Sequence, residues 1–213
     1  MSLGNGNPKH GDKGSNFDFE HRVLKGMTAI AEAMENTPHN YGLFSQTTSS
    51  TPVAATTTEG SLIGTGVGQL SVPADGFVVG DSFSVIMGGS ISTGSGQTIR
   101  IRVKADNGVT TINLADSGVQ TLTNNLSNEA FELRVNFTIR SIGAATVASI
   151  KSMSTFVTNR NLFNILSGFE FSNIESTNFD TTLINTLDIT AEWGSNNAAN
   201  SISSDIFTLI KIF

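Results

Sequence analysis

A strict two-residue alternation of apolar and polar side chains runs through residues 129–140, which read EAFELRVNFTIR. Successive side chains of a β-strand point to opposite faces of the sheet, so this alternation sorts the apolar side chains onto one face. The apolar set is Phe131, Leu133, Val135, Phe137 and Ile139. The segment therefore predicts a strand that has one face in a core and the other in solvent.

Other segments repeat this pattern. TIRIRVK, residues 98–104, directs Ile99, Ile101 and Val103 inward, and TLDITAEW, residues 186–193, directs Leu187, Ile189, Ala191 and Trp193 inward. Less regular strand patterns, separated by turn-forming segments such as ADG, GSG and DNG, cover residues 62–72, 81–90, 110–122, 144–157, 168–174 and 205–213. The last of these contains IFTLIKIF, which is apolar on both faces and predicts a central strand or a strand in a subunit interface.

About eight or nine strands without intervening helices predict an all-β fold, an antiparallel jelly-roll β-sandwich, which we place over residues 60–213. The composition agrees with this class. Only 14% of the residues are charged, and the abundant Gly, Ser, Thr and Asn suit tight turns and pleated strands better than helices.

The N-terminal part of the chain has a different character. Residues 1–16 are rich in Gly, Asn, Lys and Ser, which predicts an extended arm that only a partner can order. Within residues 17–36, Val23, Met27, Ile30 and Met34 recur at helical spacing and predict one short amphipathic helix. Residues 37–59, with the run TTSSTPVAATTTEG, are expected to form a Thr/Ser-rich linker that joins modules without packing.

The apolar stripe of the predicted helix has three readings. It packs on its own domain, lies in a partner's groove, or associates with copies of itself. Because a linker is expected between the stripe and the sandwich, the second and third readings are favoured. A homotrimer would let the helices and the sandwiches each bury an apolar face. We therefore assign oligomerisation to Val23, Met27, Ile30 and Met34.

Charge and composition restrict the partners. The formal net charge is -6, whereas nucleic-acid binding depends on clustered Lys and Arg, so we expect no nucleic-acid partner. No stretch approaches the roughly 18 apolar residues of a membrane span, so we expect no membrane partner. Residues 64–69, GTGVGQ, lack the Lys and the Ser or Thr of a phosphate-binding loop, and the chain has no cysteine. We expect no cofactor and no metal site.

The same inspection favours a protein that is not an enzyme. The three histidines, His10, His21 and His39, all precede the predicted sandwich, so the hydroxyls in it lack the usual activating base. The candidates for a glycosidase pair are Glu170, Glu175, Asp180, Asp188 and Glu192. Of these, Asp188 and Glu192 share a face of one strand and are expected to face solvent rather than to be buried with a shifted pKa. Trp193 and the loop of residues 194–201 are candidates for sugar binding, although a lone inward Trp more often belongs to the core.

Several segments together resemble a known family. They are GNGNPKHGDKGSNFDFEHRVLKGM at the start of the chain, followed by SVPADGFVVGDSF, TIRIRVK, LADSGVQTL, FTIRSIG, DTTLINTLDITAEWG and NSISSDIFTLIKI. Their combination resembles the jelly-roll structural proteins of tailed bacteriophages, which include head fibres, capsid decorations and tail fibre tips. The resemblance implies a virion component, commonly trimeric, that attaches through its N-terminal segment and displays its jelly roll outward. It transfers no catalytic or ligand-binding residue.

On this basis we expect a homotrimeric head fibre or capsid decoration protein, located in the virion, whose arm contacts the capsid or other virion proteins. The expected attachment residues are Asn5, Asn7, Pro8, Lys9, Asp12, Lys13, Asn16, Phe17 and Phe19. Two alternatives stay open, since one sandwich fold hosts many functions. One is a tail fibre or receptor-binding protein that recognises host surface polysaccharide, and the other is a glycan-degrading enzyme.

Overall fold

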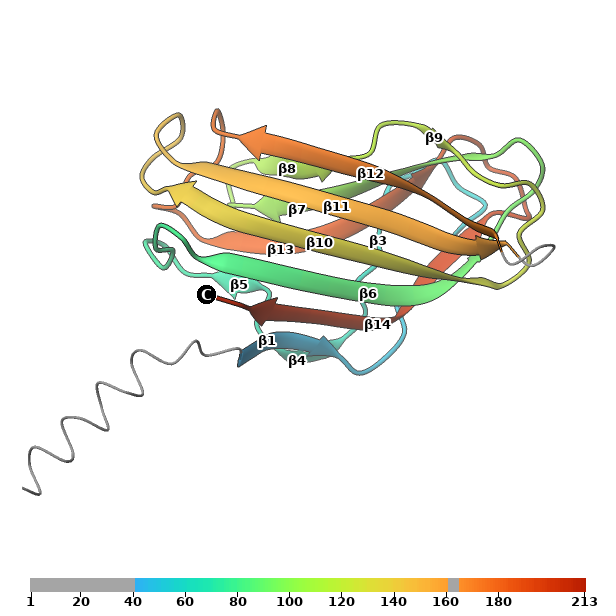
Figure 1. The fold of residues 1–213 in the computed structure, drawn as a ribbon, viewed down its shortest axis with the longest axis horizontal. Helices are drawn as coiled ribbons and strands as arrows, with labels where there is room; N and C mark the ends of the chain where they lie inside the picture. Colours follow the sequence, from blue (N-terminus) through green and yellow to red (C-terminus); the bar gives the residue numbers. More distant parts are fainter. Residues whose placement is uncertain (1–40, 161–164) are drawn as a thin grey trace, which may run out of the picture. The chain divides into compact units, whose positions relative to one another are not determined.

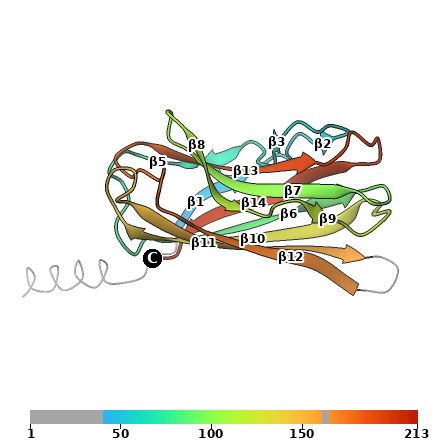
Figure 2. The same ribbon diagram turned by 90° about the horizontal axis from the view of Figure 1, so that it is seen from above.

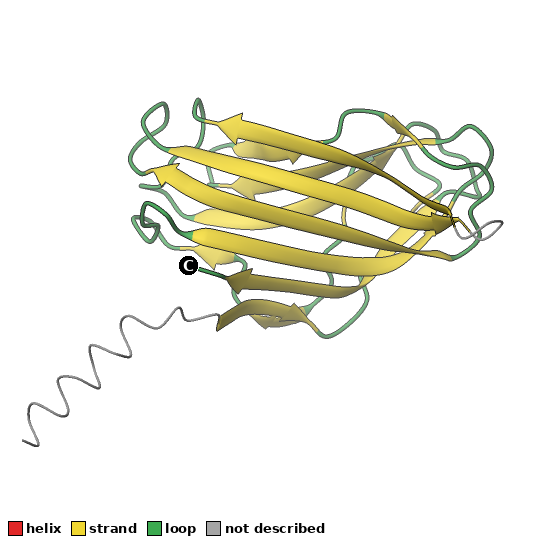
Figure 3. Cartoon of the chain, in the orientation of Figure 1, coloured by secondary structure: helices red, strands yellow, loops and turns green. Residues whose placement is uncertain are grey.

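In the computed structural model, residues 41–160 and 165–213 are described, and they form two antiparallel sheets with no helix (Figure 1, Figure 3). The larger sheet, sheet A, contains in spatial order β12 (Ile165–Glu175), β11 (Ser149–Arg160), β10 (Glu129–Ser141), β6 (Ser82–Ser92), β14 (Ser201–Lys211), β1 (Tyr41–Gln46) and β4 (Gly66–Gly68), with β2 (Val53–Ala54) paired to β14. Sheet B contains β3 (Gly60–Ser61), β13 (Asn185–Trp193), β7 (Thr98–Asp106) and β8 (Thr111–Asp116), with β5 (Ser71–Val72) on β13 and β9 (Gln120–Thr121) on β7. The predicted all-β antiparallel fold is confirmed.

The two sheets form two layers around one core (Figure 2). The predicted alternation of β10 is confirmed, because all five of its apolar side chains from Phe131 to Ile139 are buried. The alternation predicted for β7 and β13 is confirmed as well. Ile101 lies opposite Ala191 and Ile99 lies opposite Trp193 across the paired strands, and all four side chains are buried.

The last strand lies inside sheet A, which is one of the two positions predicted for it. β14 pairs with β6 on one side and with β1 on the other. Its register shifts between Ser204 and Ile206, so Asp205 is an extra residue on this strand. This β-bulge leaves Ile206 exposed on the outer face and returns Phe207 to the core.

The prediction of a linker over residues 37–59 is wrong for residues 41–59. β1 pairs with β14 and β4, and Phe44 contacts Phe207 in the core with ring centroids 5.7 Å apart. The polar residues that follow bond to the sheet, because their hydroxyls and backbone groups find partners there. The Ser204 amide, for example, donates to the Ser50 hydroxyl at 2.9 Å. The sandwich therefore includes residues from Tyr41 onward, not from residue 60.

The single strand predicted over residues 62–72 is also wrong. The segment follows β3 of sheet B and instead contains two short strands, β4 in sheet A and β5 in sheet B. Its glycines explain the path, since a Cβ added at Gly64 or Gly66 would lie 2.1 or 2.2 Å from a backbone oxygen of the neighbouring segment. Only glycine allows this close backbone contact as the chain crosses between the sheets.

Candidate functional site

A cluster of charged side chains covers the outer face of sheet B. We call it the charged face, and it consists of Glu59, Arg100, Arg102, Lys104, Asp116, Asp188 and Glu192. β7 supplies the three cations at alternate positions, and its pairing with β13 and β8 places carboxylates beside them. The face arises because opposite charges occupy the outward positions of strands that become neighbours.

Arg102 lies at the centre of the charged face. Its guanidinium is 2.7 Å from the carboxylate of Glu192, 3.1 Å from that of Glu59 and 3.6 Å from that of Asp116. Only 9% of the residue is exposed. Glu59 also accepts a bond from Lys104 at 2.9 Å, and Arg100 holds Asp116 at 2.8 Å. One cation thus joins carboxylates from three separate segments of the chain.

These contacts stabilise the ionised carboxylates. Burial works against ionisation of Glu59, but hydrogen bonds from Thr190 and Lys104 and the charge of Arg102 outweigh it, so the pKa of Glu59 is lowered. The hydrogen bond from Arg100 likewise lowers the pKa of Asp116. Both groups therefore contribute stability above their unfolded pKa values, and this contribution is lost as the pH falls through the lowered folded values.

Asp188 is the exception on this face. Burial is the main cause that raises its pKa, although its Oδ1 accepts hydrogen bonds from the Ser61 hydroxyl at 2.6 Å and from the Ile189 amide at 2.8 Å. Asp188 lies on the outer face of sheet B, as expected, but it is half-buried there beside Ser61 of β3, and the expectation that its pKa is unshifted is wrong. Glu192 remains about one-third exposed, with 35% of its side chain accessible beside Arg102.

Asp188 and Glu192 both have protein partners on the charged face. Asp188 accepts hydrogen bonds from the Ser61 hydroxyl and the Ile189 amide, and the Glu192 carboxylate lies 2.7 Å from the guanidinium of Arg102. The two residues lie four positions apart on one extended strand, which separates their Cα atoms by about 13 Å at roughly 3.3 Å per residue.

Replacing Asp188 by Asn is expected to stabilise the protein at neutral pH. A raised folded pKa means that the folded state favours the protonated form, so stability is lost as the pH rises through that value. Asn keeps an oxygen for Ser61 and Ile189 and carries no charge. In urea denaturation, the midpoint of the variant should exceed that of the wild type near pH 7 and approach it near pH 3, where Asp188 is largely protonated in both states.

Glu170→Gln is the matched control for that experiment, because Glu170 is exposed on β12. Its midpoint should follow the wild type at both pH values. A lower stability of the Asp188 variant at neutral pH would show that the carboxylate stabilises the fold, against this interpretation.

A second candidate surface is the outer face of sheet A. We call its central part the open face, defined by Ile86, Gly88, Arg134, Ile206 and Thr208. Gly88 lies opposite Ile206, and Ile86 lies between Thr208 on β14 and Arg134 on β10. Ile206 is 60% exposed and Ile86 is 38% exposed. Two large apolar side chains thus lie diagonally adjacent on the broad face of the longest strands, where small residues leave the backbone accessible.

Polar loops meet at the end of the sandwich remote from the C-terminus. The loop before β7, the loop before β10 and the loop before β14 bond to one another, as when the Gly96 amide donates to Asn124 Oδ1 at 2.7 Å. Asn200 is buried among them and donates to Gln97 Oε1 at 3.0 Å. The amides of Asn196 and Asn197 are on exposed residues. Hydrogen bonds between the loops therefore hold them together, and exposed amide groups of the loops remain available to a ligand.

Trp193 belongs to the core and not to these loops. Its side chain is 1% exposed, and its Nε1 donates to the Val53 carbonyl oxygen at 2.8 Å. The preference for a core role over sugar stacking is therefore confirmed. This bond joins β13 of sheet B to β2 of sheet A.

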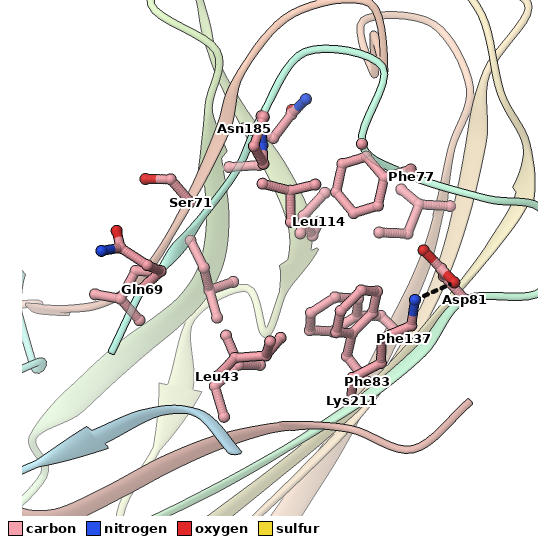
Figure 4. A pocket seen from close by; sticks show the side chains of 18 of the residues that line it. Leu43, Gln69, Ser71, Phe77, Asp81, Phe83, Leu114, Phe137, Asn185 and Lys211 are labelled. Carbon is pink, nitrogen blue, oxygen red and sulfur yellow. Dashed lines mark ion pairs between the residues drawn. The ribbon is translucent and has the colours of Figure 1, made fainter. Parts of the chain in front are cut away.

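A cavity of about 220 Å³ lies between the sheets at the end where the C-terminus lies (Figure 4). Strands of both sheets and the loops of residues 73–81 and 176–184 contribute to its walls. Most of the side chains that surround it are apolar. The polar ones include Gln69, Ser71 and Asn185, together with Asp81 and Lys211, which form an ion pair at 2.6 Å.

The predicted attachment and oligomerisation residues lie outside the described residues. This holds for the arm set from Asn5 to Phe19, for the helix set from Val23 to Met34 and for all three histidines. Conversely, Glu59 and Arg102 of the charged face were not predicted as site residues. The charged face could have been predicted from the cations that alternate along β7 and the acids that alternate along β13. No local sequence pattern indicates the cavity.

Among residues 41–160 and 165–213, no helix has the length and apolar character needed to cross a membrane. No protein-family model matches the chain, and no curated protein matches it either.

Proposed function

We propose that this chain is a structural protein of a tailed-phage virion, a homotrimeric head fibre or capsid decoration that displays a jelly roll and does not act as an enzyme. The observation that carries the proposal is the open face. Exposed Ile86 and Ile206 lie on a broad sheet, beside Gly88 and Thr208, where a second copy can approach closely. Exposed apolar side chains grouped on one surface are typical of protein interfaces.

The strand order supports the jelly-roll part of the proposal. The chain crosses from sheet A to sheet B between β6 and β7, returns before β10, crosses again between β12 and β13, and returns before β14. As a result, the last strand lies between β6 and β1. Double-sheet jelly rolls are built from Greek-key connections of this kind.

The use of charge in the sandwich is compatible with a structural role. Glu59, Asp116 and Glu192 all pair with arginine on the charged face. Paired carboxylates join strands, whereas a general acid needs a proton that it can release to a substrate. Attachment to the virion is proposed for residues 1–36 from their sequence and from the resemblance to phage proteins.

Deleting residues 1–16 is expected to abolish attachment to the phage particle and to leave the sandwich folded. The arm is proposed to gain order only from its partner, and the core of the sandwich is formed by residues from Phe44 onward. Particles incubated with the truncated and the full-length protein are sedimented, and bound protein is quantified. Circular dichroism and the thermal midpoint report the fold.

The control for chain length is a variant in which Gly and Ser replace residues 1–16 and the length of the arm is unchanged. It should fail to attach, as the deletion does. Wild-type occupancy by the truncated protein would refute the role of the arm.

A receptor-binding role is the second candidate, and the polar loops favour it. Asn196 and Asn197 are exposed on loops that hydrogen bonds to Asn124 and Gln97 hold in place. Side-chain amides are suitable donors and acceptors for sugar hydroxyls. Binding of the full-length protein to an array of bacterial surface polysaccharides, lost on replacing Asn196 and Asn197 by Ala, would favour this role over simple decoration.

A further inference from the structure

We propose that the end of the sandwich where the C-terminus lies makes a second contact with the virion and binds an apolar surface of the protein to which the N-terminal segment attaches. We call this surface the apolar end. It comprises six exposed apolar side chains, which are Val78, Val79, Ile142, Val147, Ile184 and Phe213. The inference rests on the proposed virion role, and it names the surface through which the sandwich itself takes part in attachment.

The six side chains come from four segments that the two sheets bring to the same end (Figure 1). The connections between β5 and β6, between β10 and β11 and between β12 and β13 carry five of them, and Phe213 follows β14. Their exposed fractions range from 45% for Ile142 to 70% for Phe213. Large apolar side chains that are grouped on the surface of a protein are typical of interaction sites.

Hydrogen bonds between the connections hold the apolar end together. The Thr181 amide donates to the Gly143 carbonyl oxygen at 3.0 Å, and the Gly143 amide donates to the Thr181 hydroxyl at 2.8 Å. The Asp75 amide donates to the Thr181 carbonyl oxygen at 2.8 Å. The buried rings of Phe77 and Phe179, from two of these connections, have centroids 5.8 Å apart. A surface that is already ordered loses little conformational entropy on binding.

The start of β1 indicates which partner covers this end. Tyr41 lies opposite Lys211 in sheet A, two residues before Phe213. The proposed attachment segment, residues 1–36, therefore joins the sandwich at the apolar end. A protein bound by that segment is held near the apolar end by the covalent connection, so even a weak apolar contact there adds to the affinity of attachment.

The charges of the four segments favour a protein partner over a lipid bilayer. Residues 73–81, 142–148, 176–184 and 212–213 contain no lysine or arginine, and their acidic residues are Asp75, Asp81 and Asp180. Surfaces that bind anionic membranes carry basic residues beside the apolar ones. Apolar side chains with few charges are instead typical of the centre of a protein–protein interface. The partner is therefore expected to present an apolar, uncharged surface.

The test measures binding of the full-length protein to phage particles assembled without it. Val78→Asp places a charge at the apolar end, and Phe213→Ser removes its most exposed side chain without adding a charge. Because the arm still attaches, we expect Val78→Asp to bind roughly tenfold or more weakly and Phe213→Ser roughly three- to tenfold more weakly than the wild type.

Val119→Asp is the matched control, because Val119 is 69% exposed and lies next to β9, at the opposite end of the sandwich. Its affinity should stay within about twofold of the wild type. The thermal midpoints of all three variants report their folding. Wild-type affinity of folded Val78→Asp and Phe213→Ser would overturn the inference and leave the role of the arm intact, because deletion of residues 1–16 tests that role separately.

Three other results would also overturn the inference. A change in the solution mass of either variant would assign the apolar end to a contact between copies of this chain. Cosedimentation of the wild type with vesicles of phosphatidylcholine and phosphatidylglycerol would assign it to a lipid surface. If the wild-type protein itself does not bind the particles, the proposed virion role and this inference fail together.

Discussion

Replacing Arg102 by Ala is expected to lower the free energy of unfolding by about 2 to 3 kcal/mol. The guanidinium is the shared partner of Glu59, Asp116 and Glu192, so its removal leaves three carboxylates close together on the charged face. Loss of one partner from a fully buried pair costs about 3 to 5 kcal/mol. The lower figure applies here because the Glu59 and Glu192 side chains remain 28% and 35% exposed.

Urea denaturation with and without added salt measures this effect. Salt should reduce the difference between wild type and variant, since screening weakens repulsion among partly exposed carboxylates. Arg140→Ala is the control, because Arg140 is exposed on β10 and makes no ion pair among the described residues. It should match the wild type. An Arg102 variant as stable as the Arg140 variant would show that the charged face contributes no net stability.

Replacing Ile206 by Arg is expected to dissociate the proposed homotrimer into monomers. Ile206 is the most exposed large apolar side chain of the open face, and in an assembly built on that face each copy would place a new charge near its neighbours. Desolvation and like-charge repulsion at such a contact cost several kcal/mol. Sedimentation velocity at micromolar protein concentration should therefore resolve a single species of the monomer mass.

Val147→Arg is the matched control for Ile206→Arg. Val147 is 62% exposed and lies in the connection between β10 and β11, away from the open face. This variant should retain the wild-type mass. If Ile206→Arg also keeps that mass while remaining folded, the open face is not the subunit interface.

The alternating strands were the part of the fold that local pattern could predict. In β10, β7 and β13 each residue's face follows from its position in a period of two, so the core residues Phe131, Ile101 and Trp193 could be identified directly. The position of β14 was predictable for the same reason. Its two apolar faces predicted a central strand or a strand in a subunit interface, and it lies between β6 and β1, with Ile206 exposed on its outer face.

The errors arose where pairing partners are distant in sequence. Residues 41–59 are polar and lack alternation, yet they pack because β14, over 140 residues later, bonds to β1 and β2. The Ser50 hydroxyl, for example, accepts its bond from the backbone of Ser204. No local composition separates such hydroxyls from those of an extended linker.

The candidate sites were predictable to different degrees. The cations of β7 and the acids of β13 alternate visibly, but the role of Glu59 depends on how the segment before β3 folds over sheet B. The cavity depends on the packing of Phe77 and Phe179 from two separate loops. Such tertiary details have no periodic signature in the chain.

The most direct test of the proposed assembly is the mass of the full-length protein in solution, measured by light scattering during size-exclusion chromatography. The proposal predicts one species with three times the chain mass of 22.5 kDa at micromolar concentration. A species of the single-chain mass under the same conditions would contradict the proposed homotrimer.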